Sequence, residues 1–151
     1  MKHHSWSLVA MKGIVSLLGV GFLRPASATL GSLAAGLLLY PFWPTLSSTT
    51  KLQAILIIFI IGWFFSQKIE QAEHLHDPHF IVIDEALGMM MSTFFLGQIW
   101  WQWLIAFLLF RFFDIAKFWP ASWFDQRKGG FSIMFDDVLM AIPVIAIGFF
   151  L

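Results

Sequence analysis

The sequence predicts an all-α integral membrane protein, folded as one membrane-embedded domain over residues 1–151. Hydrophobic residues make up 59% of the chain and charged residues only 12%, whereas soluble proteins carry about 25% charged residues. The 18 Phe and 8 Trp add to this apolar content. Apolar runs separated by short polar segments indicate a compact polytopic bundle of about five membrane helices, preceded by an N-terminal interfacial segment.

Composition also excludes several classes of protein. Nine Lys and Arg balance nine Asp and Glu, so the formal net charge is zero. A nucleic-acid partner is therefore not expected, because no basic stripe is present to neutralise phosphates. The chain has no Cys, which removes disulfides, thiolate zinc sites and a cysteine-phosphate intermediate.

The N-terminal part contains one interrupted apolar run and one helix of small residues. Residues 5–23 are apolar but are broken by Lys12 and by glycines, so a surface-lying or partly inserted segment fits better than a clean span. Residues 24–28 form a loop. Thr29 then begins a helix that continues to Tyr40, and its small residues allow a neighbouring helix to approach closely.

The rest of the chain alternates apolar and polar segments. Residues 52–65 are the clearest membrane signal, but the run is shorter than the ~20 residues that a span needs, so flanking residues have to complete it. Residues 66–79 are the only extended polar segment, and we expect them to continue the helix until Pro78 ends it. A polar loop is expected at residues 118–130. Further membrane helices are expected at residues 80–96, 99–113 and 131–151.

Charged residues gather on one side of this topology. If the N-terminus and residues 66–80 and 114–130 share a side, all nine acids lie on or near it. Eight of the nine Lys and Arg lie there too, and Lys51 alone lies opposite. The positive-inside rule predicts that this side faces the cytoplasm.

Two pairs of adjacent acids stand near the starts of apolar runs, Asp84-Glu85 and Asp136-Asp137. An ionised side chain at the edge of the hydrocarbon is costly unless it faces a polar cavity or a partner. One pair alone is equally well explained as an acidic helix N-terminus, which the helix dipole favours. Two pairs, together with Asp114 at another helix end, indicate one site. Clustered carboxylates need a cation, and oxygen ligands favour Mg²⁺, Ca²⁺ or Mn²⁺.

Cationic side chains flank Asp114 on the same helix. Arg111 and Lys117 lie three residues to either side of it, which keeps all three on one side of the helix. A snorkelling helix end explains Lys117. It explains Arg111 less well, because phenylalanines surround this residue. A guanidinium fork suits phosphate oxygens, so we expect a metal cluster of acids that faces cationic phosphate ligands.

At these residues the chain resembles the phosphatidylglycerophosphatase A family. Four blocks match in order and together span most of the chain. They are Thr29 to Leu33; Asp77-Pro78 with Ile81 to Glu85 and Gly88; Phe110 to Lys117 with Trp119-Pro120; and Gly129 to Asp137. The chain departs from the family pattern in short loop stretches, where Ser27-Ala28 replaces Pro-Gly and Phe131-Ser132 replaces x-Gly.

The resemblance implies a Mg²⁺-dependent lipid phosphatase of the bacterial inner membrane, multi-pass, with its active site facing the cytoplasm. It would hydrolyse phosphatidylglycerophosphate to phosphatidylglycerol and phosphate in phospholipid biosynthesis, with this phospholipid phosphate and membrane lipids as its partners. The implied catalytic acids are Asp84, Glu85, Asp136 and Asp137. The implied metal ligands are the same four acids and Asp114, and the implied phosphate-binding residues are Arg111, Lys117 and Thr29.

Other readings of the same residues stay open. A membrane cation transporter or channel would also place acids in a membrane, although here the charges cluster at one face. A phosphotransferase acting on nucleotide-activated lipids would use clustered acids and Mg²⁺, but its Asp-Gly and Ala-Arg block is missing from the sequence. Water attack and an aspartyl-phosphate intermediate are both compatible with the residues, and the oligomeric state is open. We read His74, His76 and His79 as interfacial polar residues.

Overall fold

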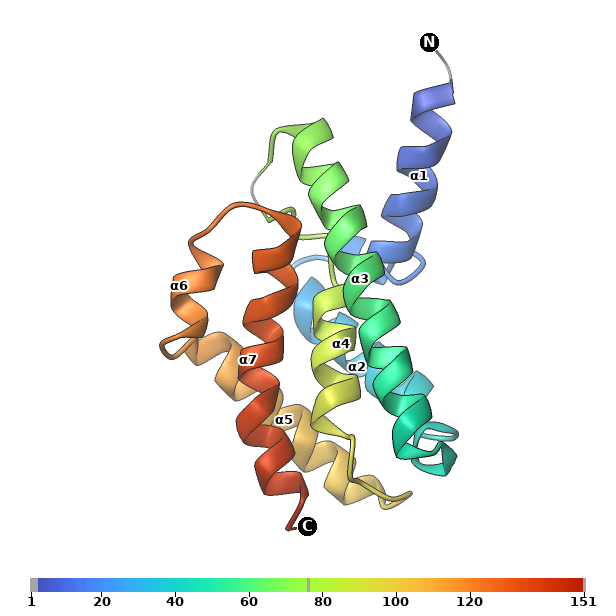
Figure 1. Ribbon diagram of the computed structural model, residues 1–151, viewed down its shortest axis with the longest axis vertical. Coiled ribbons are helices and arrows are strands. Elements are labelled where there is room, and N and C mark those ends of the chain that lie inside the picture. The colour runs from blue at the N-terminus through green and yellow to red at the C-terminus, as the bar shows by residue number, and fades with distance from the viewer. Residues whose placement is uncertain (1–2, 76, 151) are drawn as a thin grey trace.

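The computed structural model describes residues 3–75 and 77–150, and within these ranges the secondary structure is entirely helical (Figure 1). In chain order the elements are α1 (His3–Val15), η1 (Val20–Phe22), α2 (Ser27–Leu39), η2 (Trp43–Thr45), α3 (Ser48–Glu73), α4 (Ile83–Ser92), α5 (Trp100–Ala116), α6 (Ala121–Asp125) and α7 (Gly130–Gly148).

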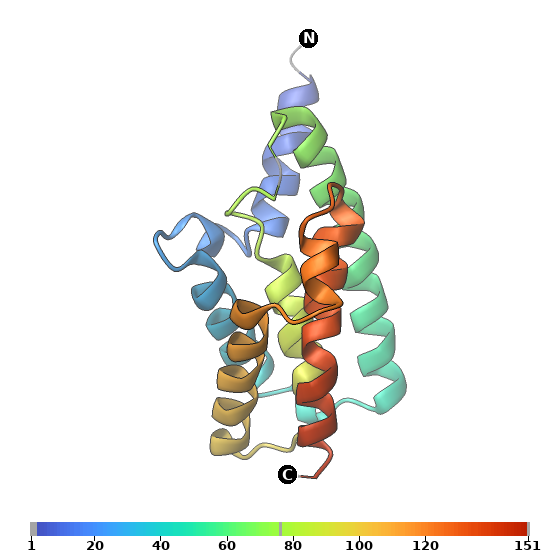
Figure 2. The same cartoon turned by 90° about the vertical axis from the view of Figure 1, so that its left-hand side faces the viewer.

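The short helix α4 lies at the centre of the fold. It contacts α2, α3, α5 and α7, and Figure 2 shows it between α7 and the α2–α5 side. Every residue of α4 except Met91 is buried. A side chain at Gly88 would collide with the ring of Phe110, which is fully buried on α5. The missing side chain therefore lets α5 pack directly on α4.

Two helices, α3 and α7, are long and apolar enough to cross a membrane. Along α3 the large apolar side chains Leu52, Leu56 and Ile60 are more than half exposed. Soluble monomers rarely leave a wide apolar surface uncovered, so this helix is typical of a membrane protein. Among the described residues, α2, α4 and α5 are shorter than a full span, and the structure does not itself give the expected count of five membrane helices.

The expected span at residues 80–96 is wrong in its extent. Helix α4 has only ten residues and rises about 15 Å, half of the ~30 Å hydrocarbon thickness. It ends in a turn at Thr93: Phe94 N donates to the Met91 carbonyl and Leu96 N to the Thr93 carbonyl, each three residues back instead of four. Hydropathy misses this end because the residues that follow are also apolar.

Other boundaries agree better with the sequence. Helix α3 continues through the polar segment to Glu73, and His74 takes a left-handed φ of 55° that ends it before Pro78. The expected loop at residues 118–130 instead contains the short helix α6. Helix α1 packs on α3, and an ion pair joins Lys12 to Glu73.

Three links hold the helix ends around α4. Val82 N donates to the Val15 carbonyl at 2.9 Å, and Ser27 Oγ donates to the His79 carbonyl at 2.8 Å. On the other side Gly130 N donates to Gln67 Oε1 at 2.9 Å. These links tie the start of α4 to the end of α1, the start of α2 to the segment before α4, and the start of α7 to α3.

Candidate active site

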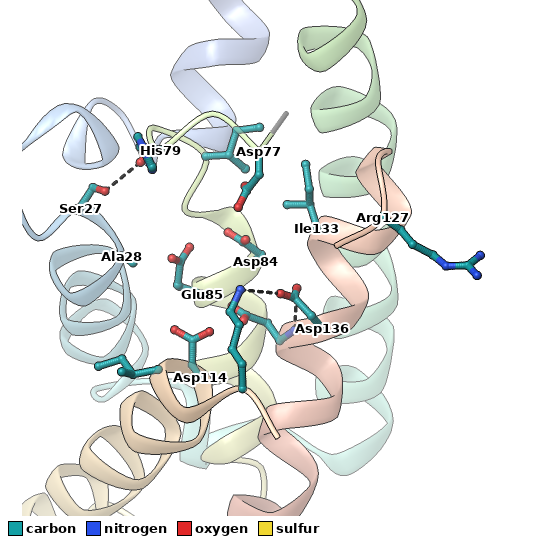
Figure 3. A pocket seen from close by; sticks show the side chains of 14 residues that line it. Ser27, Ala28, Asp77, His79, Asp84, Glu85, Asp114, Arg127, Ile133 and Asp136 are labelled. Atoms are coloured by element: carbon teal, nitrogen blue, oxygen red, sulfur yellow. Dashed lines mark hydrogen bonds and ion pairs between the residues drawn. The ribbon is translucent and has the colours of Figure 1, made fainter. Parts of the chain in front are cut away.

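A cavity of about 280 Å³ opens where the starts of α2, α4 and α7 meet the end of α5 (Figure 3). Its lining comes from these four helices, from the segment before α4 and from the link between α6 and α7. The lining residues are Ser27, Ala28, Asp77, His79, Ile81, Asp84, Glu85, Asp114, Ile115, Lys117, Arg127, Ile133, Asp136 and Asp137.

All five acids that the sequence singled out line this cavity and are buried. Asp84 and Glu85 occupy the first turn of α4, where the positive end of the helix dipole favours acids. Asp136 and Asp137 lie in the second turn of α7, and Asp114 lies in the last turn of α5. Residues up to 53 positions apart in the sequence therefore share one cavity, with Asp84 and Asp137 on the same side of the molecule.

Two of these acids are ion-paired. Arg111 Nη1 donates to Asp114 Oδ2 at 2.5 Å, and Lys117 Nζ lies 3.1 Å from Asp136 Oδ2. Asp136 Oδ1 also accepts from the backbone N–H of Asp137 at 3.0 Å. Lys117 lines the cavity, whereas Arg111 is buried behind Asp114. Lys117 is thus the cation that faces the cavity among the two that the sequence predicted.

The other three acids, Asp84, Glu85 and Asp137, form a compact oxygen cluster. One carboxylate oxygen from each lies within 4.8 Å of the others. Each also has a buried oxygen without a hydrogen-bond partner in the described part of the chain: Asp84 Oδ1, Glu85 Oε2 and Asp137 Oδ2. Buried carboxylates that lack a partner are strongly unfavourable. These three side chains therefore fit a hard divalent cation, for which carboxylate oxygens are the usual ligands.

Sequence reasoning did not select all of the lining residues. Asp77 directs its carboxylate toward Asp84 in Figure 3, from a backbone with a left-handed φ of 44°. Strained non-glycine residues of this kind are enriched at active sites. Its position in the Asp77-Pro78 block, directly before the first acid pair, is the signal that could have identified it. Lys117 has the same feature, with φ 40°.

Three further residues need placing. Thr29 is not among the lining residues, although Ser27 and Ala28 in the same first turn of α2 are. His79 lines the cavity, although the sequence favoured an interfacial role. Arg127 extends away from the acids in Figure 3, and its guanidinium lies 3.4 Å from the centre of the Trp123 ring. It was not among the predicted site residues.

Buried carboxylates beside a lysine, on a helical scaffold with membrane-type helices, fit a membrane enzyme of phosphate chemistry. The chain belongs to the phosphatidylglycerophosphatase A family, whose model matches residues 13–151. The resemblance that the motifs indicated is thereby confirmed, and so is the assignment of the chain as a phosphoric monoester hydrolase.

Named relatives agree with this family. A phosphatidylglycerophosphatase A of Haemophilus influenzae is 36% identical over 147 residues, which cover 93% of this chain and 90% of the relative. A phosphatidylglycerophosphatase A of Escherichia coli is 35% identical over 144 residues, covering 89% and 81%. A Bacteroides thetaiotaomicron protein, provisionally named a phosphatidylinositol-3-phosphatase, is 31% identical, covering 82% of each chain. No solved structure matches the chain significantly.

Proposed function

We propose that this protein hydrolyses phosphatidylglycerophosphate to phosphatidylglycerol and inorganic phosphate, with Mg²⁺ as its cofactor. The names of two relatives supply the substrate. The observation that carries the proposal is the cluster of Asp84, Glu85 and Asp137, whose unbonded oxygens lie in the same cavity as Lys117. This arrangement supports a cation and a phosphate side by side.

The residues divide into three roles in this proposal. Asp84, Glu85 and Asp137 hold the divalent cation, which would polarise the phosphate ester and neutralise charge that develops on it. Lys117 donates to the phosphate oxygens. Asp136 keeps the Lys117 ammonium at the cavity, and Asp114 holds Arg111 in place through the buried ion pair.

We also propose a multi-pass arrangement in the bacterial inner membrane, in which α2, α5 and the half-length helix α4 lie in the membrane beside α3 and α7, five membrane helices in all. The distribution of charge supports this orientation. The acid cavity lies at one end of α4, and Lys51 lies at the other, where its Nζ donates to the Phe94 carbonyl at 2.7 Å. The positive-inside rule then directs the acid cavity to the cytoplasm.

The transporter or channel alternative receives no support. The acids of the central bundle gather in one cavity at one end of α4 rather than along a path, and the named relatives are phosphatases. The name of the third relative raises an inositol phospholipid as a second substrate class. The same assay, run with both lipids, compares the two headgroups.

The test is phosphate release from phosphatidylglycerophosphate by the purified protein, with and without Mg²⁺. We expect release that requires Mg²⁺, and we expect Asp84→Asn to lower it at least ~100-fold, the scale for a lost electrostatic or acid–base group. Glu73→Gln, outside the cavity, serves as the control. Full activity of Asp84→Asn would overturn the metal site. Cation flux in liposomes without phosphate release would favour the transporter.

A further inference from the structure

A second hollow, of about 290 Å³, lies on the membrane-type surface between α2 and α5, with α4 behind it. We call it the α2–α5 groove. Its lining is apolar and largely aromatic or aliphatic. The lining residues are Ser32, Leu33, Gly36, Leu37, Tyr40, Met89, Trp100, Trp103, Leu104 and Phe107.

Three polar side chains in the groove, Ser32, Tyr40 and Trp103, use their donors elsewhere. Ser32 Oγ donates to the Ala28 carbonyl at 2.9 Å, and Trp103 Nε1 donates to the Gly97 carbonyl at 2.8 Å. Tyr40 Oη donates to the Gln98 carbonyl at 3.1 Å. A polar ligand would therefore find little to bond with in the groove, whereas a hydrocarbon chain suits its lining.

The groove lies beyond the acid cavity along the same helices. On α2 the cavity is lined as far as Ala28 and the groove begins at Ser32, one turn or about 6 Å further along. On α4 the same step separates Glu85 from Met89. From Ala28 to Tyr40 the helix rises about 18 Å, close to one leaflet of a ~30 Å hydrocarbon layer.

The groove is also open on the correct side for a lipid. Leu37 and Trp100 are each 68% exposed, so the groove faces outward along its length. Its far end is closed, because Gln98 Nε2 donates to the Pro41 carbonyl at 2.7 Å and the Tyr40 ring meets the edge of Trp103. A chain that entered from the acid cavity would end at this closure.

We infer that the α2–α5 groove binds one acyl chain of the lipid whose phosphate enters the acid cavity. The inference rests on the proposed function for the phosphate end and adds a separate site for the hydrocarbon. It follows that the protein recognises its substrate at two points: the phosphate monoester in the acid cavity, and the acyl chain one helical turn further along α2 and α4.

The first test blocks the groove. Gly36 lines it, and an added Cβ would lie 3.2 Å from Cε of Met89, the flexible end of that side chain. Gly36→Leu therefore fills the groove with limited strain. We expect kcat/KM for phosphatidylglycerophosphate with two hexadecanoyl chains to fall at least about tenfold, the scale of hydrophobic-pocket discrimination. For the same headgroup with butanoyl chains we expect no change. Equal losses for both lipids, or no loss for either, would overturn the inference.

Substitutions at a matched pair of leucines distinguish blocking of the groove from misfolding. Leu37 lines the groove and Leu38 does not, yet both are exposed on α2, by 68% and 64%. We expect Leu37→Trp to lower long-chain kcat/KM selectively and Leu38→Trp to leave it unchanged. If both variants behave alike, the chain does not lie in the groove.

Photo-crosslinking then tests the groove without turnover. A phospholipid phosphate with a diazirine in one acyl chain should label Leu33, Leu37 or Leu104, and a phospholipid without a phosphate monoester should not compete. Labelling of these residues without phosphate release would support acyl-chain binding in the groove and contradict the proposed function. Phosphate release with labelling outside the groove would support the proposed function and overturn the inference. Equal labelling by any phospholipid would identify a bulk-lipid contact and overturn the inference.

Discussion

Lys117 Nζ lies 3.1 Å from Asp136 Oδ2, and this ion pair joins the end of α5 to the second turn of α7. The lysine side chain is 32% exposed and the aspartate side chain 8%. The buried acid therefore positions a cation at the mouth of the cavity, where an incoming phosphate can displace part of its hydration. The packing of two separate helices is therefore needed to place one ammonium group.

Removing that ammonium should weaken phosphate binding. Lys117→Gly is the informative change, because glycine accepts the left-handed φ of 40° that Lys117 adopts without strain. We expect kcat/KM for phosphate release to fall about 100-fold, the typical scale for a lost charge-stabilising group. Steady-state kinetics of the purified variant measure it. Lys128→Gly, exposed in the nearby link, is the control; a wild-type kcat/KM for Lys117→Gly would show that Lys117 does not contact the phosphate.

Asp137→Asn should weaken the binding of the divalent cation. Its Oδ2 is one of three buried carboxylate oxygens that have no hydrogen-bond partner among the described residues. Changes to residues that merely orient metal ligands cost about 10–100-fold in affinity, so a direct ligand should cost at least about tenfold. The rise in Tm on addition of Mg²⁺ reports the affinity, because a ligand that binds the folded state stabilises it. Glu73→Gln should keep the wild-type response, and an unchanged Mg²⁺ response in Asp137→Asn would exclude this ligand.

Asp77 should contribute a smaller electrostatic effect. It directs its carboxylate toward Asp84 (Figure 3) but is less buried than the acids on α4. Asp77→Asn keeps a side chain that tolerates φ 44° and removes the charge. We expect kcat/KM to fall about tenfold, which corresponds to about 1.4 kcal/mol, with the Tm preserved. A loss as large as that of Asp84→Asn would instead make Asp77 a direct member of the metal cluster.

The candidate site was largely predictable because charge is scarce in this chain. In a sequence with so few ionisable residues, each acid beside an apolar run is conspicuous, and Asp84, Asp114 and Asp137 do reach one cavity. The pairing within the site was not predictable. Which acid neutralises Lys117 depends on how α5 and α7 pack, and hydropathy carries no information about that.

The fold was predictable where an apolar run ends in polar residues and not elsewhere. The end of α3 at Glu73 agrees with its polar flank. The end of α4 at Ser92 does not, because the chain turns at Thr93 while the residues that follow are still apolar. Lys51 is a similar case: its sequence position suggests an exposed loop, but it is only 6% exposed, and its Nζ also lies over the rings of Trp43 and Phe94.

Gly88→Ala should destabilise the protein, although the same change usually stabilises a helix. In a helix interior, alanine is usually more favourable than glycine by about 1 kcal/mol. Here the new methyl group would meet the Phe110 ring, which is fully buried and has no room to move away. Overpacking of this kind costs about 1–3 kcal/mol, so we expect a lower Tm in detergent. Glu85 lies one turn away on α4, and phosphate release should therefore fall as well.

Gly97→Ala provides the matched control, because an added Cβ there meets nothing within 4 Å. Phe110→Leu should restore part of the stability of Gly88→Ala, and the double-mutant cycle would measure the coupling between the two positions. A Gly88→Ala variant that melts higher than the wild type would mean that α4 and α5 are not in close contact. The position of Glu85 relative to Asp114, and with it the shape of the cavity, depends on that contact.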